Sequence, residues 1–343
     1  MKKPGFLAPR QKEKKRDNID ETRSRDEKLP IFDKSAIFLY HEKVKKSTSI
    51  FSQSKEMRLI DLTQFLGLPY FEAPNCLIYN MDCLEAMERL PNEFLHLTVT
   101  SPPYNIGKEY EKTLPLDEYL NWCEGWIKEI YRLTAPNGAF WLNLGYLSLP
   151  DRAKAIPITY LLWDKICFYL IQEIVWNYGA GVAGSKFFSP RNEKFLWYVK
   201  NQKDYTFNLD DVRDPNVKYP NQKKNGKIKV NVNGKNPTDV WEFPKVTSGQ
   251  NRASKERTPH PAQFPLKVIE RIIKASSNVN DIILDPFMGS GTTAVAALGL
   301  NRQVIGFEIK GDYCEIAAKR IDSFLIQKEL KEAQLSLFEV WEF

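Results

Sequence analysis

Two short segments of the sequence carry groups that could hold a ligand and do chemistry on it. The first, Ser101-Pro102-Pro103-Tyr104, follows an apolar run at 95–100. Two consecutive prolines cannot donate backbone hydrogen bonds and hold a rigid turn, so their carbonyls are fixed acceptors beside the Ser101 hydroxyl. Tyr104 adds a flat aromatic face. The combination suits a planar ring bearing an NH₂ group, although the same residues could also form a purely structural turn.

The second segment is a glycine-containing loop, Asp285-Pro286-Phe287-Met288-Gly289-Ser290-Gly291-Thr292-Thr293. Its glycines permit positive φ and let a ligand approach the backbone closely, and the helix that follows offers N–H groups at its N-terminus. The loop matches neither the GxGxxG dinucleotide fingerprint nor the GxxxxGK[ST] phosphate loop. It therefore predicts a ligand site of another kind, or only a tight connection.

Acidic residues stand at the ends of two expected strands around this loop. Glu308 follows the apolar run 303–307, where an acid typically bridges ribose hydroxyls. Asp285 ends the preceding strand and would face the charged amino-acid part of a cofactor. Glu308 could equally be an ordinary charge at a strand end, but its pairing with the glycine loop favours a cofactor site.

The elements that must position these segments alternate in type. The expected strands cover 76–79, 95–100, 139–144, 281–284 and 303–307, and the expected helices cover 84–90, 116–133 and 292–300. Pro136-Asn137-Gly138 would end the second helix. Such alternation predicts an α/β, Rossmann-like fold whose mostly parallel sheet has helices on both faces. Ligands bind at the carboxyl ends of strands in such sheets, where both chemical segments lie.

The stretch from 200 to 258 has a different composition. Polar residues dominate it, and six lysines and no acid lie between Lys218 and Lys235. We expect an insertion outside the sheet that offers a surface for nucleic-acid phosphates, although lysine-rich loops are also common on proteins without such a partner. The net charge of +6 agrees with a polyanionic partner but is weak evidence alone. The lysines expected to contact phosphates are Lys218, Lys223, Lys224, Lys227 and Lys229.

Several classes of protein are disfavoured. The five cysteines are odd in number and form no CxxC pair, which predicts reduced thiols and no metal site. The most apolar region, 155–176, is interrupted by charged residues and is not expected to span a membrane. Without an apolar leader at its N-terminus, the chain is expected in the cytoplasm. The dense mixture of charges at 1–50 predicts a disordered arm.

The two segments together resemble the amino-methyltransferases of DNA. Because Thr100-Ser101-Pro102-Pro103-Tyr104 precedes the glycine loop, the order resembles the beta group, in which the catalytic half comes first and the motif order is circularly permuted. Further segments are similar: Asn80-Met81-Asp82-Cys83-Leu84, the run 191–200, Asp239-Val240-Trp241-Glu242-Phe243-Pro244, and the run 259–265. The resemblance covers roughly 75–325.

The resemblance implies S-adenosylmethionine as cofactor and double-stranded DNA as partner. Asp82 would reach the adenine of the cofactor, and His260, Pro261 and Phe264 would line its methionine pocket. Arg191 would flank the target base. The other implied cofactor contacts are Asp285, Phe287, Gly289, Gly291, Thr292 and Glu308.

The resemblance also divides the chain. After the arm at 1–50, the catalytic half would cover 51–199, a target-recognition insertion 200–258, the cofactor half 259–325 and a tail 326–343. A monomer or homodimer acting beside a separate restriction endonuclease fits such enzymes. No metal is expected.

Ser101 carries the choice of base. Relatives with Asp at this position usually methylate adenine N6, whereas those with Ser mostly methylate cytosine N4, so cytosine N4 is favoured and adenine N6 is the alternative. The carbon-5 enzymes require a cysteine after a proline, which this chain lacks. A non-catalytic DNA-binding protein with the same fold, or a methyltransferase for RNA or a small molecule, also stays open.

Overall fold

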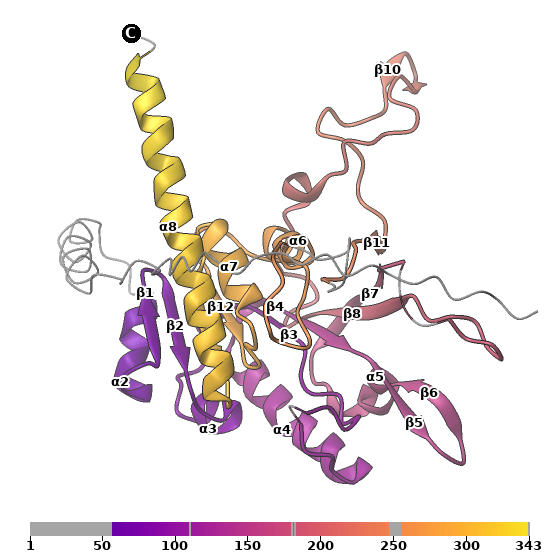
Figure 1. Cartoon of the computed structure of the whole chain (residues 1–343). Coiled ribbons are helices and arrows are strands. Elements are labelled where there is room, and N and C mark those ends of the chain that lie inside the picture. The colour runs from indigo at the N-terminus through magenta and orange to yellow at the C-terminus, as the bar shows by residue number, and fades with distance from the viewer. Residues whose placement is uncertain (1–56, 110, 180, 182, 247–254, 342–343) are drawn as a thin grey trace, which may run out of the picture. The chain divides into compact units, whose positions relative to one another are not determined.

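The computed structural model describes residues 57–109, 111–179, 181, 183–246 and 255–341, without the side chains of 335–341. The arm expected at 1–50 lies outside the described residues. One large sheet dominates this part of the chain (Figure 1). In spatial order its strands are β1 (Phe71–Ala73), β2 (Cys76–Tyr79), β13 (Gln303–Phe307), β12 (Ile282–Asp285), β3 (Leu95–Thr100), β4 (Thr134–Leu144), β8 (Asn192–Val199), β7 (Tyr169–Asn177) and β11 (Val240–Glu242).

The sheet is mostly parallel, as the alternation of elements predicted. From β2 to β4 every neighbouring pair is parallel, whereas β8 runs antiparallel to both β4 and β7. β12 lies beside β3 although the two strands are far apart in sequence, with Ile283 opposite Leu97 and Leu284 opposite Thr98. The parallel register therefore brings the carboxyl ends of the two chemical strands to one edge.

Helices cover both faces of the sheet because alternate residues of each strand point to opposite sides. Leu77 and Leu284 pack against one layer, and Ile78 and Ile283 pack against the other. The first layer contains η1 (Leu59–Leu62), α2 (Thr63–Leu66), α3 (Cys83–Glu88) and α4 (Leu116–Leu133). The second layer contains α6 (Leu266–Ser276), α7 (Thr292–Gly299) and α8 (Gly311–Trp341).

Several shorter elements lie outside the large sheet and its helices. An antiparallel pair, β5 (Tyr146–Leu149) and β6 (Ala153–Pro157), follows β4. The remaining short helices are α5 (Ile158–Leu161), η2 (Trp163–Lys165) and η3 (Leu209–Val212), and a small hairpin consists of β9 (Lys223–Lys224) and β10 (Lys227–Ile228). Within the described residues, no helix is long and apolar enough to cross a membrane. All five cysteines are free thiols.

The structure corrects three boundaries expected from sequence. β4 begins at Thr134, not at 139, and so includes Pro136-Asn137-Gly138, which were expected only to end the preceding helix; a register irregularity between Leu95 and Leu97 of β3 accommodates this stretch. β11 belongs to the sheet although it falls within the expected insertion at 200–258, because buried Trp241 anchors it beside β7. The division at 325/326 falls inside α8, so the expected tail continues that helix as far as Trp341.

Apart from β11, residues 200–246 lie outside the large sheet. This stretch leaves the sheet after β8 and is held at its base by a bridge in which Asp214 and Lys235 exchange backbone hydrogen bonds. The β9–β10 hairpin projects from this base, away from the sheet (Figure 1). Its lysines are exposed.

Candidate active site

The ends of β3 and β12 bring together the two segments that were expected to do chemistry. The Ser101-Pro102-Pro103-Tyr104 turn and the glycine loop leave the sheet at the same edge because their strands are parallel neighbours. A hydrogen bond joins the two strand ends, since the Thr100 hydroxyl donates to Asp285 Oδ1 at 3.0 Å. Both segments line one cavity of about 500 Å³, a size suited to a cofactor and part of a substrate.

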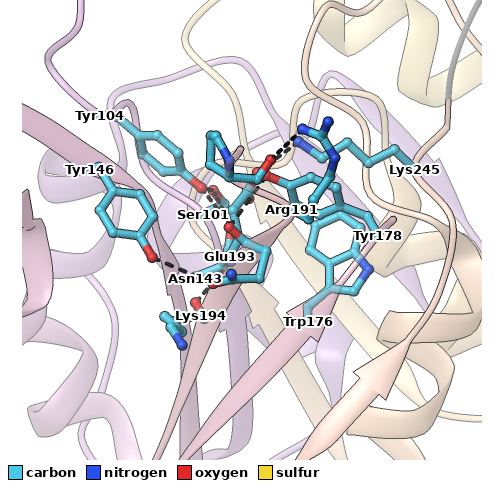
Figure 2. Close-up of polar contacts among 12 residues, drawn as sticks. Ser101, Tyr104, Asn143, Tyr146, Trp176, Tyr178, Arg191, Glu193, Lys194 and Lys245 are labelled. Atoms are coloured by element: carbon cyan, nitrogen blue, oxygen red, sulfur yellow. Dashed lines mark hydrogen bonds and ion pairs between the residues drawn. The ribbon is translucent and has the colours of Figure 1, made fainter. Parts of the chain in front are cut away.

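Ser101, Tyr104 and Asn143 form a hydrogen-bonded cluster in the wall of this cavity (Figure 2). The Tyr104 hydroxyl donates to Asn143 Oδ1 at 2.5 Å, and the Ser101 hydroxyl donates to Tyr104 Oη at 3.0 Å. Asn143 is fully buried near the end of β4, and its Nδ2 donates to the Lys194 carbonyl of β8 at 2.9 Å. That bond sets the amide so that its oxygen faces the other two side chains.

The tyrosine ring and the proline carbonyls are held by close backbone contacts. A Cβ at Gly145 would lie 2.6 Å from Tyr104 Cε2, so the ring rests on a backbone that only glycine leaves open. The Pro103 carbonyl already accepts a hydrogen bond from the Tyr119 hydroxyl at 2.8 Å. No donor among the described residues bonds to the Pro102 carbonyl. Of the two proline carbonyls, the one of Pro102 is therefore available to an amine.

The glycine loop is shaped by contacts that require its glycines. Gly289 has a φ of +51°, and a Cβ there would lie 2.9 Å from His260 Nε2. The Gly289 N–H donates to Glu308 Oε2 at 2.9 Å, which ties the loop to the end of β13. Gly291 has a φ of +75° at the start of α7 and packs against Ala317 of α8. Gly289 lies in the cavity lining, where a ligand can approach its backbone. Gly291 instead permits the turn into α7 and its packing against α8.

Two carboxyl groups of the cavity have raised pKa values: buried Asp285 and partly buried Glu308. Burial raises the pKa of Asp285 to about 6, although Thr293, Thr100 and the Phe287 N–H all donate to it. Burial likewise raises the pKa of Glu308. Burial makes it unfavourable for these carboxyl groups to ionise when no ligand is bound. A ligand with a positive charge or with hydroxyl donors stabilises their ionised form, so the site favours such a ligand. The amino-acid and ribose parts of S-adenosylmethionine fit this description.

The other predicted cofactor contacts also line the cavity, namely Asp82, His260, Pro261, Phe264, Phe287 and Thr292. Asp82 caps α3, its Oδ1 accepting from the Leu84 and Glu85 N–H groups at 2.9 and 3.2 Å. Burial lowers the pKa of His260 to about 4, so its ring is neutral at pH 7. The ring packs edge-on against Tyr313, with centroids 4.4 Å apart.

Some predicted site residues lie elsewhere. Gly291 is not part of the cavity lining, for the structural reason given above. Arg191 also stands outside the lining; its Nη1 donates to the Pro190 carbonyl at 2.9 Å, in the loop that joins β7 to β8. The insertion lysines are remote from the lining as well: Lys218, Lys223, Lys224, Lys227 and Lys229.

Comparison with known proteins agrees with this geometry. Residues 95–319 match the family model described as DNA methylase, N6_N4_Mtase. The Type II methyltransferase M.ScaI of Streptomyces caespitosus is 59% identical over 278 residues, which cover 80% of this chain and 91% of M.ScaI. M.HpaI of Haemophilus parainfluenzae is 37% identical over 246 residues, which cover 71% of this chain and 73% of M.HpaI. The chain belongs to the N6/N4 family of DNA methylases.

Solved structures share the fold of this methylase. The PvuII DNA methyltransferase (cytosine-N4-specific) superposes with a TM-score of 0.60 at 21% identity, over 75% of this chain and 89% of the other. A putative DNA modification methylase of Thermus thermophilus, complexed with S-adenosylmethionine, matches with a TM-score of 0.50 at 21% identity, over 72% and 93%. S-adenosylmethionine is the family's cofactor, as predicted.

Four of the lining residues that were not predicted from sequence carry polar or aromatic groups near the proline turn. Asn143 interrupts an apolar strand beside the catalytic one, which is the signal that could have identified it. Glu193 and Lys245 form an ion pair at 2.9 Å, and the Lys245 ammonium lies 3.7 Å from the ring centroid of Tyr178. Trp176 lies beside them in the lining (Figure 2). Only the pairing of β7 with β8, and the loop after β11, bring these three together.

Proposed function

We propose that this DNA methylase transfers the methyl group of S-adenosylmethionine to N4 of a cytosine in duplex DNA. The observation that carries the proposal is Ser101 at the first position of the proline turn, bonded to Tyr104 and close to the Pro102 carbonyl in the cavity wall. A cytosine turned out of the helix would place its NH₂ group between these two oxygens and its ring against Tyr104. Stacking there offsets part of the cost of unstacking the base, which is a few kcal/mol.

The chain's residues act by positioning. Bound S-adenosylmethionine supplies a methyl group on a sulfonium, which the amine nitrogen attacks as the carbon–sulfur bond breaks. Bonds from the amine hydrogens to Ser101 Oγ and the Pro102 carbonyl turn the nitrogen lone pair toward the methyl group. Orientation of this kind lowers a barrier by up to about 7–11 kcal/mol. Ser101 is too weak a base to take the proton, so the methylated amine releases it to solvent.

The cofactor would be held mainly by the second half of the chain. Asp285 would pair with its amino group, Glu308 would accept from its ribose hydroxyls, and Asp82 would reach its adenine. His260, Pro261, Phe264 and Phe287 would enclose its methionine part beside Gly289 and Thr292. The insertion at 200–258 would contact DNA phosphates through its exposed lysines, and Arg191 would lie beside the target base. Metal plays no part in this chemistry.

Adenine N6 is the second candidate. The DNA adenine methyltransferase YhdJ of Escherichia coli (strain K12) is 32% identical to this chain over 265 residues, which cover 71% of this chain and 82% of YhdJ. The PvuII methyltransferase, which shares the fold at 21% identity, is cytosine-N4-specific. The amine end of the cavity would accept either base. The choice of cytosine therefore depends on Ser101 alone.

Analysis of methylated nucleosides tests the proposal. Plasmid DNA is incubated with the full chain and methyl-labelled S-adenosylmethionine, digested to nucleosides and separated. We expect label in N4-methylcytosine. Label only in N6-methyladenine would overturn the choice of base, and no label in DNA would overturn methyl transfer itself. A parallel reaction with RNA should remain unlabelled.

The Type II relatives suggest the biological setting. We propose a role in a restriction–modification system of the cytoplasm, in which methylation protects sites from a separate endonuclease. The chain would act as a monomer or homodimer. Exposure of a plasmid to this methylase in cells should then leave it resistant to an endonuclease of the same site.

A further inference from the structure

The loop between β7 and β8 stands directly beside the cavity. Trp176 of β7 and Glu193 of β8 both line the cavity, and the loop at 178–191 joins the adjoining ends of these strands. Phe188 in this loop is 100% exposed, and neighbouring Phe187 is half exposed. Leaving a phenylalanine in water forgoes about 1.5–3 kcal/mol of burial, so a fully exposed one beside a ligand site suggests a partner.

Local contacts shape the tip of this loop. The Gly184 N–H donates to Ser189 Oγ at 2.9 Å and closes a tight turn around Phe187 and Phe188. A Cβ at Gly184 would lie only 2.5 Å from the Phe187 carbonyl oxygen, so the turn depends on glycine. Lys154 of β6 places its ammonium 4.7 Å from the Phe187 ring centroid. Phe187 is thereby engaged with the protein, while the Phe188 ring faces solvent.

The charges around the tip suit a polyanion. Exposed Lys186 precedes the two phenylalanines, exposed Arg152 lies in the β5–β6 connection, and exposed Lys154 of β6 contacts Phe187. None of these three cations is paired with an acid among the described residues. Asp151 is the only acid in the β5–β6 connection, and the β7–β8 loop contains none. An aromatic tip surrounded by basic residues matches a nucleic acid, whose phosphates surround stacked bases, better than a second apolar protein surface.

We propose that Phe188 enters the DNA duplex at the position that the target base vacates. This inference rests on the proposed function, because only an enzyme that turns its base out of the helix leaves such a gap. Four residues lie between Phe188 and Glu193, so the five steps of chain that join them span at most about 18 Å. That length lets one loop reach the base stack while the cavity holds the extruded base. Apolar side chains enter base steps of other DNA-bound proteins in this way.

Methylation of two synthetic duplexes tests the inference. Both contain the chain's own site, first located by sequencing that detects methylated bases, but in one of them the target base faces an abasic position. Phe188→Ala should lower kcat/KM about tenfold on the fully paired duplex, since an aromatic stack on a base contributes about 1–3 kcal/mol. On the abasic duplex the loss should be less than about threefold, because the target base is already released from its pair.

Two further variants complete the design. Phe188→Trp keeps an aromatic ring and should retain activity on both duplexes. Leu68→Ala removes another almost fully exposed apolar side chain, just before β1 at the opposite edge of the sheet, and should change neither rate. With 2-aminopurine at the target position, binding of the unaltered chain should raise fluorescence, and Phe188→Ala should reduce that rise.

Several results would overturn the inference. Equal losses on the two duplexes would show that Phe188 contributes to binding or folding and not to extrusion of the base. An unchanged kcat/KM of Phe188→Ala on the paired duplex would show that Phe188 has no role in acting on DNA. Concentration-dependent dimerisation that Phe188→Ala abolishes would show that the loop tip contacts a second copy of the chain instead. Failure of the proposed function is distinguishable, because the unaltered chain would then methylate neither duplex, or would methylate adenine instead of cytosine.

Discussion

The cavity proposed for the cofactor and the surface proposed for DNA, here called the cofactor side and the DNA side, differ in how their polar groups are satisfied. On the cofactor side, Asp285 is buried and bonded to Thr100 and Thr293, and the glycine loop is tied to Glu308. On the DNA side, the lysines of the β9–β10 hairpin are exposed and Phe188 faces solvent. A small ligand of fixed shape is served by groups held rigidly in advance, whereas a long polyanion is served by solvated charges at the surface.

The largest effect is expected on the cofactor side. Asp285→Asn keeps the shape of the side chain but removes the charge that would face the cofactor's amino group. Since a hydrogen bond to a charged group contributes about 1.5–3 kcal/mol, the dissociation constant for S-adenosylmethionine should rise about 100-fold. Isothermal titration calorimetry measures this, with thermal unfolding as the control for folding. An unchanged dissociation constant would remove Asp285 from the cofactor site.

The next largest effect should occur where the base meets the protein. Tyr104→Ala removes the aromatic face and should lower kcat/KM for DNA about 30-fold, as expected for a lost base–aromatic stack. Tyr104→Phe removes only the hydroxyl bonded to Asn143 and should lower kcat a few-fold. Cofactor affinity should be unchanged in both variants. Equal losses would show that the hydroxyl, and not the ring, carries the contribution of Tyr104.

Cofactor affinity should also depend on pH in a defined direction. Burial raises the pKa of Asp285 to about 6, and only its ionised form attracts a cation. Affinity should therefore fall about tenfold from pH 7 to pH 5. The free protein should show the opposite trend, because an acid whose pKa is higher in the folded chain than in the unfolded one costs stability as it ionises. This group's contribution is complete below pH 4 and is lost as pH rises through about 6.

Two variants assign that dependence. Burial raises the pKa of Glu308 as well, so both carboxyl groups could contribute, whereas His260, with a pKa of about 4, stays neutral over this range. Asp285→Asn should flatten the pH profile of cofactor binding, and Glu308→Gln should preserve its form. The reverse result would transfer the cation site to Glu308.

The smallest effect is expected at the insertion. Replacing Lys224 and Lys227 with glutamine should weaken DNA binding a few-fold and reduce the slope of log K against log salt by about 2, since each phosphate contact contributes about 0.9. Lys267→Gln, at an exposed position on α6, is the matched control and should change neither quantity. Fluorescence anisotropy at several salt concentrations measures both. A slope that does not change would place the DNA elsewhere.

The features that could be predicted from sequence are those whose residues lie close together along the chain. β2, β3, β13 and α4 were predicted with the observed bounds, because each consists of an uninterrupted apolar or amphipathic run. The cofactor loop was equally recognisable, since its glycines and strand-end acids are local in sequence.

The missed features depend on pairing over long distances. Asn143 lies near Ser101 only because β4 pairs with β3, and Lys245 meets Glu193 only because β11 joins β7. β11 was hidden because a single tryptophan anchors three residues in an otherwise polar stretch. No local sequence pattern predicts such contacts between residues that are distant along the chain.

The central claim is that the Ser101 turn presents a cytosine amine to the methyl donor. The most direct test is sequencing that detects methylated bases in unmodified DNA exposed to the full chain and S-adenosylmethionine. We predict N4-methylcytosine at one position of a single short recurring sequence, and no methylation with a Ser101→Pro variant that folds and still binds the cofactor. Methylation confined to adenine would contradict the claim.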